Sequence, residues 1–107
     1  MTTVPEHLRI DAELQIDHIR HAGDTGAAAV VRCVRGPVRL RARFHRIRGT
    51  SAPIDLELTE ILFYGHPVGE LDLSHTALVT LWGEGVPLLA AAGDAEHRWQ
   101  VVQGVNT

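Results

Sequence analysis

The chain has 107 residues, the usual length of one domain, so we expect residues 1–107 to form a single domain. Its apolar fraction of 45% is typical of globular proteins and excludes a disordered chain. The formal net charge of −3 gives no general attraction to nucleic acid or anionic membranes, and no apolar run is long enough to cross a bilayer.

The start of the sequence has neither a basic region nor an apolar segment, so no signal peptide is visible. Cys33 is the one cysteine and cannot form an internal disulfide, which is typical of a reducing cytoplasm. Because Cys33 lies in an apolar, strand-like run, we expect it to be a small buried side chain. The sequence therefore predicts a cytoplasmic protein that is not inserted in a membrane.

In the first third of the chain, apolar and polar residues alternate over residues 8–17, which predicts a half-buried strand. Residues 18–26 contain Gly23, Asp24 and Gly26 and predict a turn. Residues 27–35 are mostly apolar and predict a strand that is buried on both faces or nearly so.

Gly36 and Pro37 then predict a chain reversal. Residues 38–45 alternate again, which places the apolar side chains inward and the intervening arginines outward. Residues 49–53 have the composition of a loop, and residues 54–64 alternate as a further strand.

The last third begins with a turn-rich connection at residues 65–69. Residues 71–75 lead into a compact apolar strand at residues 76–82, and residues 98–102 predict the final strand. Residues 90–94 are small and loop-like, with enough alanine for one helical turn. About six strands with glycine or proline at most junctions indicate an all-β barrel, which leaves no exposed edges, or alternatively an open sandwich.

The order of these segments resembles the second domain of translation GTPases, the β-barrel that follows the nucleotide-binding domain in elongation factor Tu and its relatives. Residues 28–40 match a strand, an arginine-glycine turn at Arg35 and Gly36, and a return strand. Residues 54–62 and 71–83 match later strands, the second of which ends in glycine. The resemblance covers about residues 8–99 and implies a small closed six-stranded barrel.

Three departures from the family pattern concern function. Arg41 and Ala42 stand where the return strand of the family usually has Gly-Asp, and residues 74–76 replace Ala-Gly-Asp before the later strand. Val34 stands just before the arginine-glycine turn, where family members that hold the end of aminoacyl-tRNA use an acidic residue. A valine cannot accept a hydrogen bond from a ribose hydroxyl, so the resemblance implies at most weak tRNA binding for this chain.

The sequence contains no Gly-x-x-x-x-Gly-Lys-Ser/Thr loop, and it has no lysine at all. The lysine of that loop reaches the nucleotide phosphates, so GTP hydrolysis by this mechanism is excluded. We expect no bound nucleotide and no other cofactor.

The middle of the chain is rich in arginine, and its arginines are expected to crowd into one hairpin. A phosphate-binding face is one interpretation, because guanidinium groups bind phosphate oxygens bidentately. The other is a solvated outer face whose charge is absorbed by cross-strand ion pairs with the acidic residues that follow. The candidate binding surface consists of Arg35, Arg39, Arg41, Arg43 and Arg46, with Arg32 and Arg48 nearby.

A basic segment beside an acidic one also makes the surface self-complementary, which favours a homodimer or a charged protein partner. We therefore predict a non-catalytic binding module whose main role is protein association. The alternative is a weak tRNA- or rRNA-binding barrel that uses the arginines.

Catalytic and metal signals are weak. His18 and His21 have a chelating spacing, but no cysteine and no further histidine lies near them, so no metal site is expected. Ser74 and His75 are adjacent and would point to opposite faces of a strand, so we expect no enzyme activity.

The two tryptophans, Trp82 and Trp99, are expected to plug the core or a barrel end. If either is exposed, it becomes the best candidate for an interface anchor.

Overall fold

The computed structural model describes residues 10–51, 53–89 and 100–107. Within these residues the chain forms nine strands, and residues 86–89 are helical. The strands are β1 (Ala12–Ala22), β2 (Gly26–Arg35), β3 (Val38–Arg39), β4 (Arg43–Ile47), β5 (Pro53–Phe63), β6 (His66–Pro67), β7 (Glu70–Leu71), β8 (Thr76–Glu84) and β9 (Gln100–Val105).

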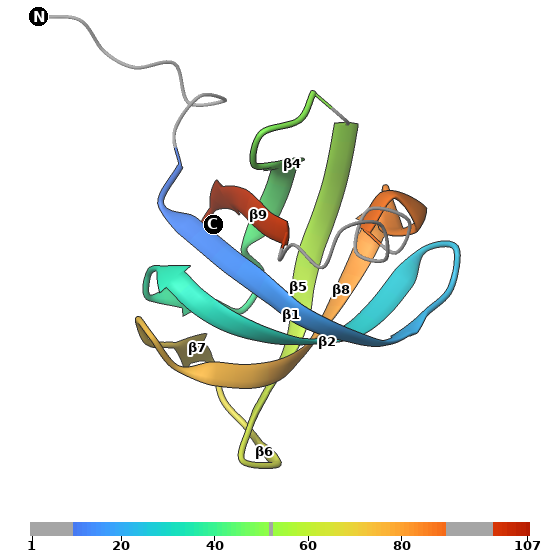
Figure 1. The fold of residues 1–107 in the computed structure, drawn as a ribbon. Helices are drawn as coiled ribbons and strands as arrows, with labels where there is room; N and C mark the ends of the chain where they lie inside the picture. The colour runs from blue at the N-terminus through green and yellow to red at the C-terminus, as the bar shows by residue number, and fades with distance from the viewer. Residues whose placement is uncertain (1–9, 52, 90–99) are drawn as a thin grey trace, which may run out of the picture.

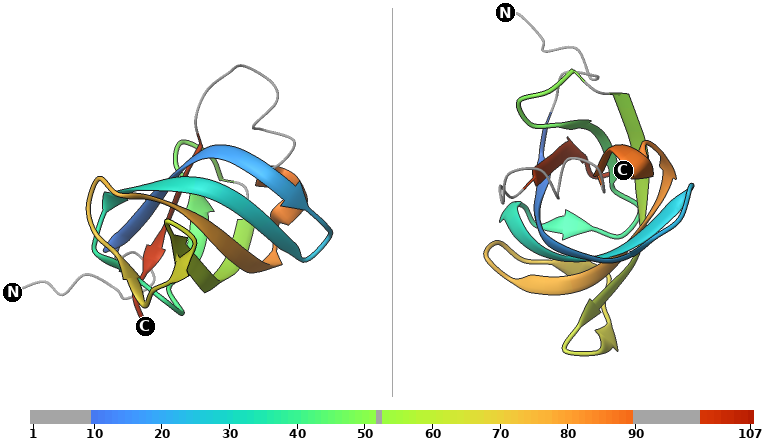
Figure 2. Two further views of the ribbon diagram at one scale, coloured as in Figure 1. Left: turned by 90° about the horizontal axis from the view of Figure 1, so that it is seen from below. Right: turned by 45° about the vertical axis from the view of Figure 1, so that its right-hand side comes forward.

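Six of the strands that the structure describes form a closed antiparallel barrel, in the order β4, β9, β1, β2, β8 and β5. β4 pairs with β9 on one side and with β5 on the other, so the ring has no open edge at this point. Figure 1 and Figure 2 show these strands curving around a common interior. The prediction of a small closed six-stranded barrel is confirmed, and the open sandwich is excluded.

The core consists of the inward side chains of the alternating strands. Leu14, Val31, Phe44, Leu58 and Leu81 are fully buried and come from five different barrel strands. Burying side chains of this size contributes roughly 1.5–3 kcal/mol each. Alternation in the sequence therefore predicts correctly which face of each strand lines the interior.

The first hairpin is longer than the sequence predicts. β1 continues to Ala22, and the turn between β1 and β2 is confined to residues 23–25. The polar residues after Asp17 stay paired with β2 through two irregularities, near His18 and near His21, which interrupt the alternation that the sequence shows. The prediction that β2 is buried on both faces is wrong, because its outer residues are partly or fully exposed.

The segment after Gly36 does not return along β2 as the sequence predicts. β2 pairs with β1 and β8, whereas β3 forms a separate two-stranded sheet with β7. Arg41 has a φ of 78°, so the chain turns there before β4 begins, although the alternation of buried and exposed residues persists across the turn. The expected single hairpin of arginines is therefore wrong.

Two residues near the end of the described chain hold this segment in place. Asn106 accepts a hydrogen bond from the backbone N–H of Arg39 at 2.8 Å and donates one to the carbonyl of Pro37 at 2.9 Å. The hydroxyl of Thr107 donates to the carbonyl of Arg41 at 3.1 Å. These bonds satisfy backbone groups that have no partner in a strand ladder.

The final strand ends later than the sequence predicts. β9 ends at Val105, whereas residues 98 and 99 of the predicted strand lie outside the described residues. The small residues at 90–94 also lie outside them. In the described part of the chain, no helix is long and apolar enough to span a membrane.

Closure of the barrel depends on close approach of backbones at Gly104. A Cβ atom at this position would collide with the backbone of Arg43 and Phe44 on β4. The β4–β9 seam therefore requires glycine here because no side chain fits between the two strands.

We expect Gly104→Ala to lower the free energy of unfolding by about 2 kcal/mol, since the added methyl group must push β4 away from β9. Urea unfolding followed by circular dichroism measures this change. Gly69→Ala is the matched control because no atom lies within 4 Å of the added methyl group. Equal stability of the two variants would contradict the role of Gly104.

Candidate functional site

The predicted arginine surface is spread over four regions of the barrel. Arg35 ends β2, Arg39 lies in β3, Arg41 lies in the turn before β4, and Arg43 and Arg46 lie in β4. All five are exposed. The structure thus brings the five together only in part, and their contacts differ.

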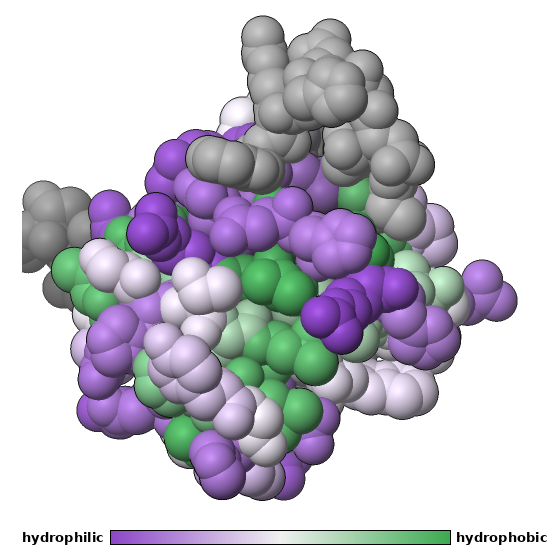
Figure 3. Space-filling view, turned by 60° about the horizontal axis from the view of Figure 1, so that its bottom comes forward, coloured by the Kyte–Doolittle hydropathy of each residue, from purple (hydrophilic) through white to green (hydrophobic). Residues whose placement is uncertain are grey.

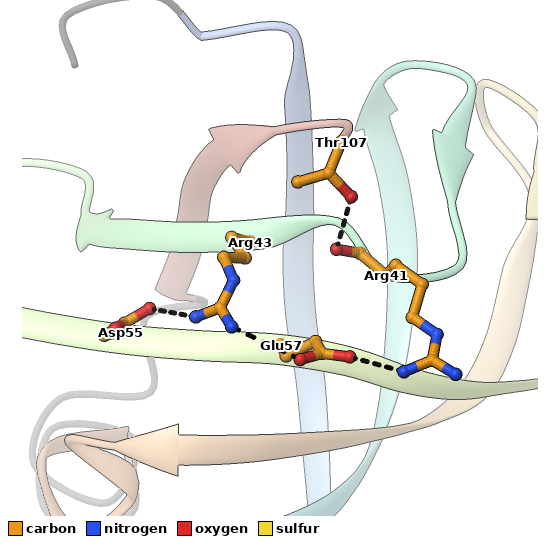
Figure 4. Close-up of polar contacts among 5 residues, drawn as sticks. All are labelled: Arg41, Arg43, Asp55, Glu57 and Thr107. Carbon is orange, nitrogen blue, oxygen red and sulfur yellow. Dashed lines mark hydrogen bonds and ion pairs between the residues drawn. The ribbon is translucent and has the colours of Figure 1, made fainter.

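Arg41 and Arg43 lie against the acidic outer face of β5 (Figure 4). Arg43 reaches Asp55 at 3.0 Å and Glu57 at 3.4 Å, and Arg41 reaches the other oxygen of Glu57 at 3.0 Å. These pairs cross the β4–β5 seam, where Arg43 and Glu57 are direct neighbours in register. Both guanidinium groups are therefore already engaged with carboxylates of the same chain.

Arg35 and Arg48 meet on a buried carboxylate. Arg35 contacts one oxygen of Glu13 at 2.7 Å, and Arg48 contacts the other at 2.8 Å. Gln103 donates a third bond to Glu13 at 2.7 Å, and the side chain of Glu13 is only 4% exposed. The cluster joins β1, β2, β9 and the turn after β4.

The charge state of Glu13 follows from these contacts. Burial alone would raise the pKa of Glu13, because it disfavours the charged form. The hydrogen bonds from Gln103 and Arg48 and the charges of Arg48 and Arg35 outweigh burial and hold the pKa below its usual value. Glu13 is therefore a carboxylate at neutral pH, and it neutralises much of the positive charge around it.

The remaining arginines differ in their partners. Arg39 lies 3.9 Å from Glu70, a loose pair at the β3–β7 edge. Arg20, Arg32 and Arg46 form no ion pair with any residue that the structure describes. Of the predicted binding surface, Arg46 alone has a guanidinium group that no carboxylate in the described part of the chain engages.

The Glu13 cluster was not predicted from the sequence. Glu13 lies between two inward residues of an alternating strand, and this pattern indicates an ordinary exposed position. Its partners are 22, 35 and 90 positions away in the sequence, so no local signal connects them to it. The pairing of β1 with β2 and β9, together with that of β4 with β9, places them next to Glu13.

Trp82 is exposed, and the expectation that it plugs the barrel is wrong. Its exposed fraction is 53%, because it lies on the outer face of β8 rather than inside the barrel. The indole ring packs over Gly26 on β2, where an added Cβ atom would lie 3.2 Å from it. Trp99 lies outside the described residues.

A groove of about 290 Å³ lies beside Trp82. Its lining is mostly small or apolar and comes from the β1–β2 hairpin and β8. The lining residues are His21, Gly23, Asp24, Thr25, Gly26, Ala27, Ala28, Thr80 and Trp82.

Three apolar side chains continue this surface across the outside of the barrel. Val30, Leu78 and Leu62 are cross-strand neighbours on β2, β8 and β5, and we call them the outer apolar row. Each is half-buried and points outward, because the residues on either side of it pack in or against the core. Figure 3 shows apolar residues forming a continuous region on the face that comes forward in that view.

The sequence signals for metal binding and nucleophilic chemistry gain no support from geometry. The structure assembles no group of three potential metal ligands among the residues it describes, and His18 and His21 are both exposed. Cys33 is fully buried, and burial raises the pKa of its thiol, which disfavours the reactive thiolate. His75 stacks on Phe63 with ring centroids 5.1 Å apart.

Comparisons with known proteins identify the fold. No family model matches the sequence, and no curated protein matches it. Among solved structures, it is similar to the apo form of translation elongation factor SelB from Methanococcus maripaludis, with a TM-score of 0.67 and 10% identity. The match covers 97% of this chain and 21% of that chain, so the chain spans about a fifth of the length of SelB. The expected resemblance to a translation-factor barrel is thus confirmed at the level of the fold.

We expect Glu13→Gln to destabilise the protein by about 1–3 kcal/mol at neutral pH, since two arginines lose their carboxylate. The folded pKa of Glu13 lies below its usual value of 4.5, so its contribution is complete above that pH and is lost as the pH falls through the folded pKa. The difference between wild type and variant should therefore shrink on acidification. Urea unfolding over a pH series measures it.

Glu60→Gln is the matched control, because Glu60 is exposed and has no ion pair within the described residues. It should leave the pH dependence of stability unchanged. A constant destabilisation by Glu13→Gln at every pH would contradict the role assigned to its charge.

Proposed function

We propose that this chain is a non-catalytic, cytoplasmic binding module whose main role is association with protein, either a second copy or a different partner. The observation that carries the proposal is the outward placement of apolar side chains on neighbouring strands, namely the outer apolar row and the exposed Trp82 on the same face of β8. An exposed apolar region bounded by polar residues marks interaction sites in water-soluble proteins, and tryptophan is enriched among the residues that dominate binding energy.

The engagement of the arginines supports the same proposal. Arg35, Arg41 and Arg43 each contact a carboxylate within 3.4 Å, so phosphate would have to displace a partner that is already in place. Replacing a carboxylate by a phosphate gains less binding free energy than adding a phosphate to a free guanidinium group. The surface that the sequence suggested for phosphate is therefore less available than its composition indicates.

The state of the nucleophile candidates supports a non-catalytic role. Cys33 is inaccessible, and Ser74 is in a turn with a φ of 73° in which its backbone N–H binds the carbonyl of Cys33. No nucleotide or other cofactor is part of the proposal.

We expect Leu78→Glu to abolish association while leaving the barrel folded, because Leu78 faces outward and a charge there interrupts the apolar surface. Light scattering over a concentration series tests self-association, and quantitative co-purification tests a different partner. His45→Glu on β4 is the matched control, since it adds the same charge to an exposed strand position outside the row. Equal loss in both variants, or loss in neither, would contradict the proposal.

A second candidate function is weak binding to tRNA or rRNA. The observation that favours it is the exposed guanidinium group of Arg46, which forms no ion pair with any described residue, with Arg43 and Arg41 on the same side of the barrel. The structural similarity to a translation factor makes RNA a reasonable ligand class to test, although a shared fold does not carry a function with it.

Salt dependence separates the two functions. The RNA function predicts that binding of bulk tRNA, measured by anisotropy, survives physiological salt and weakens on Arg46→Ser and on serine substitution of Arg39, Arg41 and Arg43. We expect instead that any binding seen at low salt disappears at physiological salt. Arg20→Ser on β1 is the control for a nonspecific loss of charge.

A further inference from the structure

We propose that the groove beside Trp82 binds a basic segment of a different protein, with an arginine or lysine side chain placed against the indole ring. The inference rests on the proposed function and names the chemistry of the partner.

The groove has a ready surface for one extended side chain. Its lining includes the small residues Gly26, Ala27 and Ala28 and the side chain of Trp82. Its volume of about 290 Å³ lies just below the range of roughly 300–1,000 Å³ for small-molecule pockets. A groove of this size fits a long side chain better than a cofactor.

The exposed indole has the right chemistry for a cation. The face of a tryptophan ring carries negative potential, and guanidinium and ammonium groups bind to it. Gly26 supports one side of the indole, while 53% of the residue remains exposed to solvent. Trp82 is thus held by its own chain and remains available to a ligand.

The carboxylates around the groove favour an occupant with positive charge. Asp24 lines the groove, Glu84 follows Trp82 by two positions on β8, and Glu60 is the cross-strand neighbour of Thr80, which also lines the groove. None of these three acids forms an ion pair with a residue that the structure describes. Their charge is therefore available to a cation from outside.

No arginine that the structure describes forms an ion pair with these three acids. Four of the eight described arginines are engaged instead by Glu13 or by the carboxylates of β5. Arg20, which precedes His21 of the groove, is exposed and forms no ion pair with Asp24. An acidic rim also repels the phosphates of RNA, so the groove favours a basic peptide over nucleic acid.

The test uses the full chain and short fluorescent Gly-Ser peptides that carry several arginines, several lysines, or several glutamates. We expect the basic peptides to bind and the acidic peptide not to bind. Trp82→Leu keeps an apolar side chain but removes the ring face, and should weaken binding about fivefold, which corresponds to ~1 kcal/mol. Binding is measured by anisotropy, and the indole N–H resonance of Trp82 should shift on peptide addition.

Glu60→Gln and Glu84→Gln should each weaken binding about twofold to fivefold. Asp72→Asn is the matched control, because it removes an exposed acid that does not line the groove and has no ion pair among the described residues. Equal weakening by Asp72→Asn, or equal binding by wild type and Trp82→Leu, would overturn the proposal. Tighter binding of the acidic peptide or of single-stranded RNA would also overturn it.

Two further results separate this inference from the proposed function. A dimer that Trp82→Leu dissociates would show that the occupant is a second copy, which overturns the basic partner but keeps protein association. If basic peptides fail to bind while Leu78→Glu still abolishes association, the basic partner is overturned and protein association is kept. Insensitivity of association to Leu78→Glu would instead contradict the proposed function itself.

Discussion

The carboxylate of Glu13 is buried on the outer side of β1, and the strands around it are arranged so that its charge is met. Arg35 comes from β2, Gln103 from β9, and Arg48 from the turn after β4. An unmatched carboxylate at this position would cost several kcal/mol, so these elements can occupy only positions from which they reach it. The cluster therefore links the closing strand β4 to the first hairpin, and it does so next to the seam where Gly104 lets two backbones approach.

The same cluster explains why the fold was easier to predict from the sequence than the surface. Alternation is a local property, and it correctly assigns Leu14, Phe44 and Leu56 to the interior. Ion pairs on the outer face depend on strand order and register, which alternation does not contain. The pairing of β4 with β9 and of β3 with β7 decides which arginines meet carboxylates. The arginines that the sequence predicts in one hairpin therefore lie in separate groups.

The pairing also divides the surface into two electrostatic regions. On the β4–β5 side, Arg41 and Arg43 are matched by Asp55 and Glu57, so the charges largely cancel within the chain. Around the groove, three carboxylates near the exposed Trp82 form no ion pair with the described part of the chain. A charge left unmatched at an apolar surface favours one sign of partner and disfavours the other, which is how a small interface gains specificity. The net charge of the chain is only −3, but its negative charge is concentrated around the groove.

The similarity to SelB shows a shared scaffold, and Val34 shows why the scaffold alone does not decide the ligand. The resemblance seen in the sequence places an acidic residue before the arginine-glycine turn in the relatives that hold aminoacyl-tRNA, whereas this chain has Val34 there. In the structure, Val34 falls at the irregularity where β2 skips one position opposite Glu13 and Leu14. The acid that meets Arg35 comes from β1 instead, and it is buried under two arginines and a glutamine. A carboxylate in that setting holds strands together and is closed to a ribose hydroxyl, so the acid beside the arginine-glycine turn stabilises the barrel in this chain.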